Sequence, residues 1–200
     1  ISVQTRSGTI EQRYENMVDG PLYAQQLSPD GKTLYVGGNF TNIYEKYYGE
    51  AIPIDITTGE PIEGNCPMAM GNAYASISDG SGGWYLGGGF SMKTISGVQA
   101  SSNLVHIRPD CSLDPDFKVS IGSDILSLYL KDNILYIGGI FTTAGGQSRN
   151  RFAAIDVTTN SVTSFNPNVD GTIRAMTMNG NALYIGGGNL PVWEDKLEIN

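Results

Sequence analysis

Basic residues are scarce in this chain of 200 residues. Twelve lysines and arginines stand against 20 aspartates and glutamates, which gives a formal net charge of −8 at pH 7. A surface that binds nucleic acid needs clustered basic residues to neutralise phosphates, and an anionic membrane surface attracts the same residue types. The composition therefore argues against nucleic acid and against an anionic membrane as partners.

Long apolar segments are also missing. No apolar run approaches the roughly 18 residues that a transmembrane helix requires, and no long segment carries apolar residues at helical spacing. We therefore expect no membrane insertion. A chain that is poor in lysine and rich in Asn, Thr and Gly is common among secreted proteins, so we expect an extracellular or cell-surface location.

Residues that carry catalytic chemistry are few. His106 is the only histidine, and we interpret it as a polar position of a strand rather than a catalytic base or metal ligand, because nothing in the sequence supplies it with partners. Two cysteines do not make a zinc site. Neither a Gly-x-Ser-x-Gly nucleophile motif nor a Gly-rich phosphate-binding motif occurs. We expect no catalytic residue, no metal site and no cofactor.

Glycine, in contrast, is abundant. The chain has 26 glycines, nearly double the usual share of roughly 7 per cent, and much of this glycine belongs to one motif. The motif has Tyr between two large apolar residues, followed by Gly-Gly, and its tyrosines are 50, 51 and 48 residues apart. A fixed period of this size indicates one supersecondary unit used repeatedly. The four copies are Leu34–Gly38, Trp84–Gly88, Leu135–Gly139 and Leu183–Gly187.

Each period contains up to four strand candidates separated by turn residues. Pairs such as Asp30-Gly31 and Asn179-Gly180 between short alternating runs are typical of hairpin turns with positive φ. The expected strands are Leu22–Leu27, Thr33–Phe40, Ala51–Ile56 and a short one near Ile62; Ala73–Ser78, Trp84–Phe90, Leu104–Ile107 and Leu113–Phe117; Ile125–Leu130, Ile134–Ile140, Phe152–Val157 and Ser161–Phe165; and Thr172–Met178 with Ala182–Gly187.

Four antiparallel strands in about 50 residues describe the blade of a β-propeller. An apolar strand that runs into Gly-Gly resembles the kelch-like and bacterial delta-60-type propeller repeats, and the segment from Phe141 to Phe152 looks most like the delta-60 unit. The resemblance covers essentially the whole chain. It implies an all-β fold, a β-propeller of about four four-stranded blades, and no particular activity, because the family is mostly an architectural label.

The two ends of the chain suggest how the last blade is completed. The fourth repeat stops before its third and fourth strands, whereas the chain begins with two strand-like segments, Ile1–Thr5 and Thr9–Tyr14. From the motif tyrosine to the third-strand turn is 24 residues in repeats one and three and 26 in repeat two; from Tyr184 through Asn200 and on to Gly8 it is again 24. We therefore expect the N-terminal hairpin to complete the last blade.

This completion has three forms that stay open. It can close a ring within one chain, which removes the open sheet edge; it can come from a neighbouring subunit, which gives a homo-oligomer or polymer; or the chain can be a piece of a longer propeller. The expected single domain, 1–200, divides into outer strands of the last blade (1–19) and repeats at 20–70, 71–121, 122–170 and 171–200.

Neither the cysteines nor the carboxylates require a functional interpretation. By repeat alignment Cys66 and Cys111 fall toward opposite faces of adjacent blades, so the limit of roughly 7 Å between Cα atoms predicts free or intermolecularly paired thiols. Six acids precede glycine or occupy a repeated position, and the glutamates scatter without repeat logic, which favours structural and solvated carboxylates over the paired acids of a glycosidase. The turn acids are Asp19, Asp30, Asp79 and Asp170, and the repeated ones are Asp55 and Asp156.

Loops that break the repeat are the better binding candidates, because loops carry specificity on a constant scaffold. Repeat one adds Tyr44, Tyr47 and Tyr48, and repeat four adds Trp193. Exposed Tyr and Trp are typical of surfaces that bind protein or stack on sugar rings, although packing beneath the loop is an equal alternative.

The favoured function is a noncatalytic binding or structural module for protein or glycan. The alternatives are a self-assembling filament subunit with head-to-tail strand pairing and a carbohydrate-active enzyme with paired carboxylates.

Overall fold

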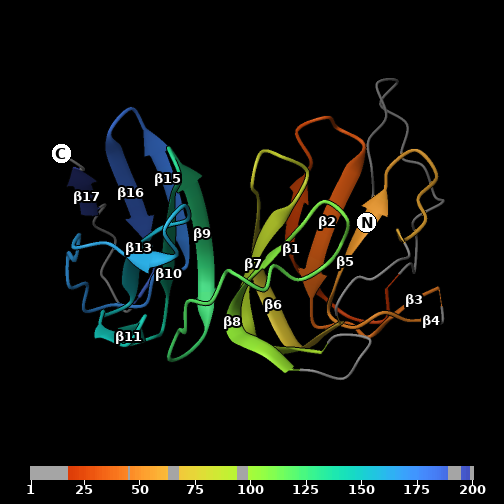
Figure 1. Ribbon diagram of the computed structural model, residues 1–200, viewed down its shortest axis with the longest axis horizontal. Coiled ribbons are helices and arrows are strands. Elements are labelled where there is room, and N and C mark those ends of the chain that lie inside the picture. The colour runs from red at the N-terminus through yellow and green to blue at the C-terminus, as the bar shows by residue number, and fades with distance from the viewer. Residues whose placement is uncertain (1–17, 45, 63–67, 94–98, 189–194, 199–200) are drawn as a thin grey trace.

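All of the regular structure is β-strand. The computed structural model describes residues 18–44, 46–62, 68–93, 99–188 and 195–198, and in these ranges no helix occurs that could cross a membrane. Four main sheets follow one another along the chain (Figure 1). Sheet 1 contains β1 (Leu22–Leu27), β2 (Thr33–Gly38) and β5 (Ala51–Asp55); sheet 2 contains β6 (Met68–Ser78), β7 (Trp84–Lys93) and β8 (Gln99–Ile107); sheet 3 contains β9 (Ile125–Lys131), β10 (Ile134–Gly139), β13 (Phe152–Asp156) and β14 (Ser161–Val162); sheet 4 contains β15 (Ala175–Asn179), β16 (Ala182–Gly186) and β17 (Asp195–Glu198).

Every sheet is an antiparallel meander with the Tyr-x-Gly-Gly motif on its second strand. In sheets 1, 2 and 3 the first strand has a bulge opposite the glycine pair of the motif. Two small hairpins follow the second strands of sheets 1 and 3. They are β3 (Asn42–Ile43) with β4 (Lys46–Tyr47), and β11 (Thr143–Ala144) with β12 (Gln147–Ser148). The observed strands confirm the predicted repeat.

The sheets pack through their first strands, since β1 contacts β6, β6 contacts β9 and β9 contacts β15. At each interface a motif glycine faces an apolar residue of the next first strand, so close that a side chain would collide with it. An added Cβ would lie 3.0 Å from Ala73 Cβ at Gly37, 2.7 Å from Ile125 Cγ2 at Gly87, and 2.5 Å from Ile173 Cγ2 at Gly138. The glycines are therefore needed for close approach of neighbouring sheets.

The motif tyrosines fill the same interfaces, as the sequence predicts. Tyr35 is 3 % exposed, stacks on Trp84 of sheet 2 with ring centroids 4.2 Å apart, and donates a hydrogen bond to the Gly82 carbonyl at 2.6 Å. Tyr85 and Tyr136 are also buried, in the apolar clusters that contain residues of sheets 3 and 4 respectively. One tyrosine per repeat thus links a sheet to its successor.

The fourth strands are shorter than predicted. In sheets 1 and 2 the expected strands near Ile62 and at Leu113–Phe117 are reduced to single bridges, Ile54 to Pro61 and Ile107 to Leu113. Proline lacks the N–H that continues a ladder, and Pro61 and Pro115 interrupt both segments. Four-stranded pairing is seen in sheet 3, where β14 adds the last strand.

Sheet 4 differs from the expectation for its third strand. Beside β16 lies β17, from the C-terminal part of the chain, paired from Ala182–Glu198 to Ile185–Asp195. The prediction that Ile1–Thr5 takes this place is therefore wrong. A segment that follows β16 closely in sequence closes a short loop, which costs less entropy than bringing back the start of the chain. Ile1–Thr5 and Thr9–Tyr14 lie outside the described residues, and the fourth strand stays a prediction.

Of the two alternatives expected for the cysteines, a free thiol is wrong for Cys111, whereas intermolecular pairing stays a prediction. Cys111 is disulfide-bonded, and no described cysteine is free; Cys66, the other cysteine, lies outside the described residues. Cys111 is buried in the apolar cluster between sheets 1 and 2. Repeat alignment locates strands but does not reveal whether a cysteine is paired, so it gave no sign of the disulfide at Cys111.

The glycine contact generates a matched test. Gly138→Ala introduces a Cβ 2.5 Å from Ile173 Cγ2, and overpacking of this kind destabilises by about 1–3 kcal/mol. The repeat-equivalent Gly186→Ala meets nothing within 4 Å, so we expect a change within about 0.5 kcal/mol. Urea unfolding of dilute protein measures both. Equal destabilisation by the two variants would contradict the role assigned to the glycine.

Candidate functional site

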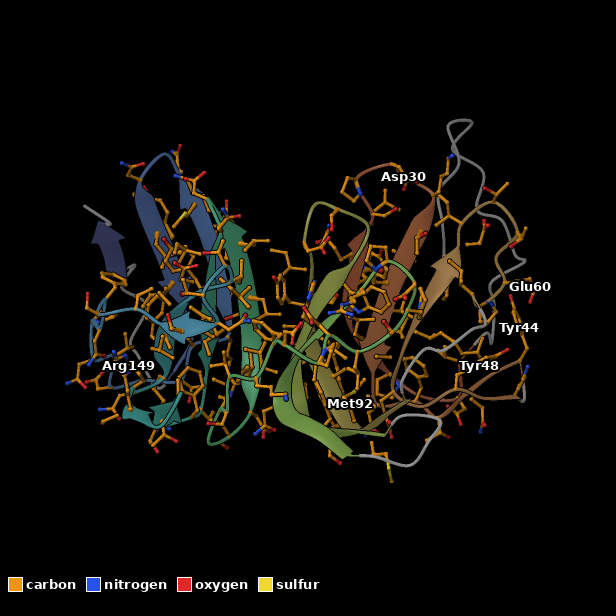
Figure 2. The ribbon with its side chains drawn as sticks, viewed as in Figure 1. Asp30, Tyr44, Tyr48, Glu60, Met92 and Arg149 are labelled. Atoms are coloured by element: carbon orange, nitrogen blue, oxygen red, sulfur yellow. The ribbon has the colours of Figure 1, made fainter. Side chains whose placement is uncertain are left out.

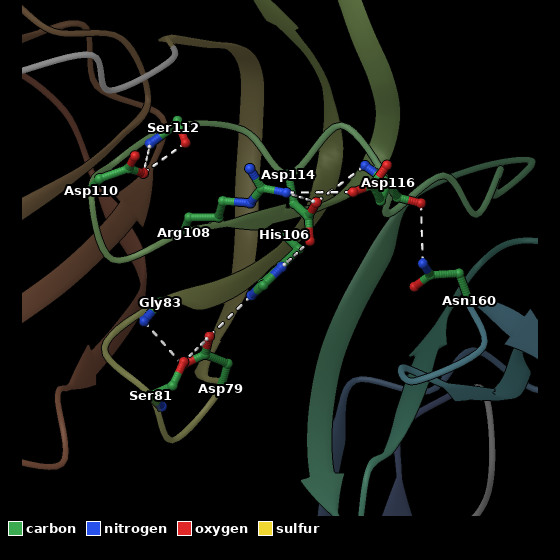
Figure 3. A network of polar contacts seen from close by, with 10 residues as sticks. All are labelled: Asp79, Ser81, Gly83, His106, Arg108, Asp110, Ser112, Asp114, Asp116 and Asn160. Atoms are coloured by element: carbon green, nitrogen blue, oxygen red, sulfur yellow. Dashed lines mark hydrogen bonds and ion pairs between the residues drawn. The ribbon is translucent and has the colours of Figure 1, made fainter.

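The single histidine lies in a cluster of charged residues on sheet 2. His106 is in β8, Asp79 follows β6, and Asp114 lies in the segment after β8. His106 Nε2 is 3.0 Å from Asp79 Oδ2, and Nδ1 is 2.9 Å from Asp114 Oδ2 (Figure 3). Because carboxylates only accept hydrogen bonds, both contacts are satisfied together when each ring nitrogen carries a hydrogen.

Further donors fix both carboxylates. The Ser81 amide donates to Asp79 Oδ1 at 2.7 Å, and Arg108 Nη2 donates to Asp114 Oδ1 at 2.8 Å. Burial raises the pKa of both carboxyl groups. At Asp79, hydrogen bonds from Ser81 and His106 outweigh the effect of burial. At Asp114, hydrogen bonding from His106 and the charge of Arg108 do the same. The pKa of each carboxyl group is therefore below its ordinary value.

Aromatic rings enclose the imidazole. Tyr85 stacks on His106 with ring centroids 4.5 Å apart, and Phe117 meets it edge-on. Burial raises the pKa of Tyr85 to about 12, with contributions from the charges of Asp79 and Asp114. Both ring nitrogens are engaged by protein carboxylates, so the arrangement gives no free nitrogen to act on a substrate proton.

The cluster instead holds sheet 2 against sheet 3. Phe117 belongs to the apolar cluster shared by these sheets, and the Asn160 amide from sheet 3 donates to the Asp116 carbonyl at 3.1 Å (Figure 3). The predicted place of His106 on a strand is confirmed, while the absence of a catalytic or metal-binding role stays a prediction. The two carboxylate partners of His106 were not foreseen, because they are distant in sequence and no motif connects them.

The repeated acids have local roles, as predicted. Asp55 Oδ1 accepts a hydrogen bond from the Thr57 amide at 2.7 Å, and Asp156 Oδ1 accepts one from the Thr158 amide at 2.8 Å. These hydrogen bonds lower the pKa of both aspartates. Over the described ranges, no group of three or more His, Cys, Asp or Glu is arranged to hold a metal ion.

The predicted loop aromatics occupy different environments. Tyr44 is 43 % exposed, whereas Tyr48 is half-buried against the core of sheet 1, with Lys46 Nζ 5.2 Å from its ring centroid. Figure 2 shows Tyr44 and Tyr48 at the outer edge of the molecule. The Tyr47 side chain and Trp193 lie outside the described part of the structure. A binding role for these four residues stays a prediction.

A second aromatic surface lies on the first strands of sheets 1 and 2. Tyr23 of β1 is 48 % exposed, and its ring centroid lies 5.4 Å from that of Tyr74 of β6. Asn72 Nδ2 donates to the Tyr74 hydroxyl at 3.0 Å. Met70 is exposed and shares a face of β6 with Asn72 and Tyr74, because strand side chains alternate. We call these four residues the inner-strand patch.

The sequence holds a signal for this patch. Tyr23 and Tyr74 both sit at the bulge of a first strand, where repeats three and four have Leu126 and Arg174. The signal is thus a departure from the repeat inside a strand rather than in a loop.

Comparison with known proteins concerns the fold. No protein-family model matches the chain, and no curated protein matches it. The computationally designed Ika4 protein superposes with a TM-score of 0.55 at 15 % identity, over 91 % of this chain and 93 % of that one. The extracellular domain of BT4673 from B. thetaiotaomicron gives 0.49 at 17 % identity, over 92 % of this chain and 21 % of that one.

The β-propeller domain of Cps50 (Swd1) from Myceliophteria thermophila gives a TM-score of 0.46 at 13 % identity, over 89 % of this chain and 60 % of that one. With the successive meander sheets described above, the chain has an all-β, propeller-like fold.

The histidine cluster generates a stability test. His106→Phe keeps a ring against Tyr85 but removes both donors, so we expect a loss of about 1–3 kcal/mol in the free energy of unfolding at pH 7. Adding Asp79→Asn and Asp114→Asn should recover part of this loss, since the unpaired charges disappear. Urea unfolding measures both effects. A single variant as stable as the parent protein would contradict the assigned role.

The lowered pKa values of Asp79 and Asp114 predict acid sensitivity. A carboxyl whose pKa is lower in the folded state stabilises the fold above its unfolded value of about 4, and that contribution disappears as pH falls further. Melting temperature should therefore drop below about pH 4, with a shallower drop in Asp79→Asn. Thermal unfolding across this range checks the slope, and parallel profiles would exclude Asp79 as a cause.

Proposed function

We propose that the chain is a noncatalytic binding module of the extracellular space or cell surface, and that the inner-strand patch binds a glycan. The observation that carries the proposal is the exposed ring of Tyr23, held against Tyr74 on the neighbouring first strand. A large aromatic ring exposed on a rigid strand has no role in packing the core.

The chemistry of the patch suits a sugar ring. The face of Tyr23 offers an apolar platform and its hydroxyl a polar group, while the amide of Asn72 lies beside the Tyr74 hydroxyl. Met70 adds a flexible apolar side chain. Because β1 and β6 are packed strands, the platform needs little ordering on binding, which favours affinity.

The carboxylates support a noncatalytic role. Asp79 and Asp114 do converge, but on His106, and each accepts further hydrogen bonds from the protein. Glycosidases need one acid to protonate the leaving group and a second to act as base or nucleophile. Two carboxylates that are both hydrogen-bonded to one histidine are not placed to act as acid and as base or nucleophile.

The disulfide supports the extracellular location. Cys111 is disulfide-bonded, and disulfides persist mainly in oxidising compartments. The low content of basic residues is consistent with the same location. The kinship with delta-60-type repeats is part of this proposal and rests on the sequence motif alone.

An oligosaccharide array, followed by calorimetry with the tightest oligosaccharide, tests the proposal. Tyr23→Ala and Tyr74→Ala should each weaken binding by roughly tenfold, because aromatic stacking contributes about 0.5–1.5 kcal/mol beyond area burial. The matched control is Tyr44→Ala, which removes an equally exposed tyrosine from the β3–β4 hairpin.

Loss of binding in the control variant alone would place the ligand on the loop aromatics instead. An array with no bound oligosaccharide would contradict a glycan ligand and leave protein as the class to test.

A further inference from the structure

The contact between sheets runs from the motif glycine on the second strand of one sheet to the start of the first strand of the next. Among the described residues, the motif glycine of sheet 4 has no such partner. In the first three repeats an added Cβ on the motif glycine would touch the next sheet, whereas at Gly186 it would meet nothing within 4 Å. Likewise Tyr184 is only half-buried, although its equivalents are 3, 4 and 6 % exposed. In the part of the chain that the structure describes, no further sheet therefore covers the face of sheet 4 that carries Tyr184 and Gly186.

This face is hollowed. An open, mainly apolar hollow of about 370 Å³ lies on β15 and β16. Register pairs Thr177 with Tyr184 and Ala175 with Gly186, so these four side-chain positions share one face. We call them the trailing face of sheet 4. The residues that line the hollow are Ala175, Met176, Thr177, Tyr184, Ile185 and Gly186.

In sheet 1 the first strand has residues that are buried by the preceding sheet in the other repeats but are partly exposed here. Leu22 lies opposite the second glycine of the motif, as Ala73 and Ile125 do in their sheets, and Ile173 precedes β15 at the equivalent place in the repeat. Those three residues are buried, but Leu22 is partly exposed.

Two residues at the other end of β1 and β2 are exposed or partly exposed as well. Leu27 is 44 % exposed and pairs with the partly exposed Leu34. The residues equivalent to Leu34, which are Trp84, Leu135 and Leu183, are buried against the preceding sheet. Val36 and Ile54 share this face by register and are buried, so Leu22, Leu27 and Leu34 are its exposed part, which we call the leading face of sheet 1.

We propose that the trailing face of sheet 4 docks the leading face of sheet 1 of a second copy of this chain. The contact continues the interface already formed three times within the molecule: Leu22 of one copy enters the space above Gly186 of the other, as Ile173 does above Gly138. Tyr184 is then covered as Tyr35 is by Trp84.

The occupant is a second copy because the strands that the structure describes leave both faces without a neighbouring sheet and the two faces continue the repeated interface. Among the described strands, no face-to-face packing joins sheet 1 to sheet 4, and the two sheets lie in different halves of the molecule (Figure 1). The contact is also unlike strand exchange, since β16 already has β15 and β17 on its two edges. It is independent of the glycan proposal, which uses other side chains.

Charge gives the association a recognisable dependence on salt. The faces are apolar, while each copy carries a net charge of −8. Added salt screens repulsion between copies and strengthens apolar contact. Association should therefore tighten with ionic strength, the opposite of an interface held by ion pairs.

Sedimentation velocity of the chain over a wide concentration range tests the proposal through two single variants. Gly186→Val fills the trailing face at a position where an added Cβ meets no atom of its own copy within 4 Å, and Leu27→Glu places a charge on the exposed leading face. Each should weaken self-association by more than about tenfold. Ile140→Ser, which removes an exposed apolar residue away from both faces, is the control and should associate like the parent protein.

An equimolar mixture of the two variants gives the decisive result. Gly186→Val keeps an intact leading face and Leu27→Glu an intact trailing face, so the mixture should form a heterodimer and nothing larger. Urea unfolding should show both variants as stable as the parent. A parent chain that is monomeric at every concentration overturns the proposal. So does association that both variants leave unchanged, or a mixture that stays monomeric while the parent associates.

Discussion

The fold depends on the absence of a side chain at one position of each of the first three repeats. Where a motif glycine faces Ala73, Ile125 or Ile173 of the following sheet, the two sheets approach to a distance that a Cβ would prevent. The motif tyrosine, two residues earlier on the same face of the strand, covers the contact from the side. Because glycine lies on the second strand and its partner on the next first strand, the sheets stack in one order and one direction.

A network of hydrogen bonds around His106 supplements this packing at one interface. In sheet 2 the residue opposite the motif tyrosine is His106, where sheets 1 and 3 have Pro53 and Ala154. An imidazole at that position stacks on Tyr85 and reaches carboxylates on both sides. Neither proline nor alanine offers a side-chain donor, so sheets 1 and 3 have no such network at this position. The apolar contact is therefore the general element of the fold, and the charged cluster a local reinforcement.

Local patterns in the sequence predicted most of the strands but few of the contacts between distant residues. Leu22–Leu27 has the expected bounds and Phe152–Asp156 ends one residue early, because alternation and turn residues determine a strand locally. The disulfide at Cys111 and the histidine cluster join segments whose relative positions no repeat alignment supplies. The pairing of β17 was missed because its sequence lacks the repeat motif.

The proposed ligand surface and the proposed docking surface share β1, and a bulge separates them. Leu22 and Ala24 pair with the successive glycines Gly38 and Gly37, which leaves Tyr23 without a pairing partner. Tyr23 then turns toward Tyr74, while Leu22 packs with the core on the opposite side of the sheet. A regular strand places neighbouring residues on opposite faces but keeps both in the ladder. The bulge frees one side chain for a ligand and leaves the interface to the next sheet intact.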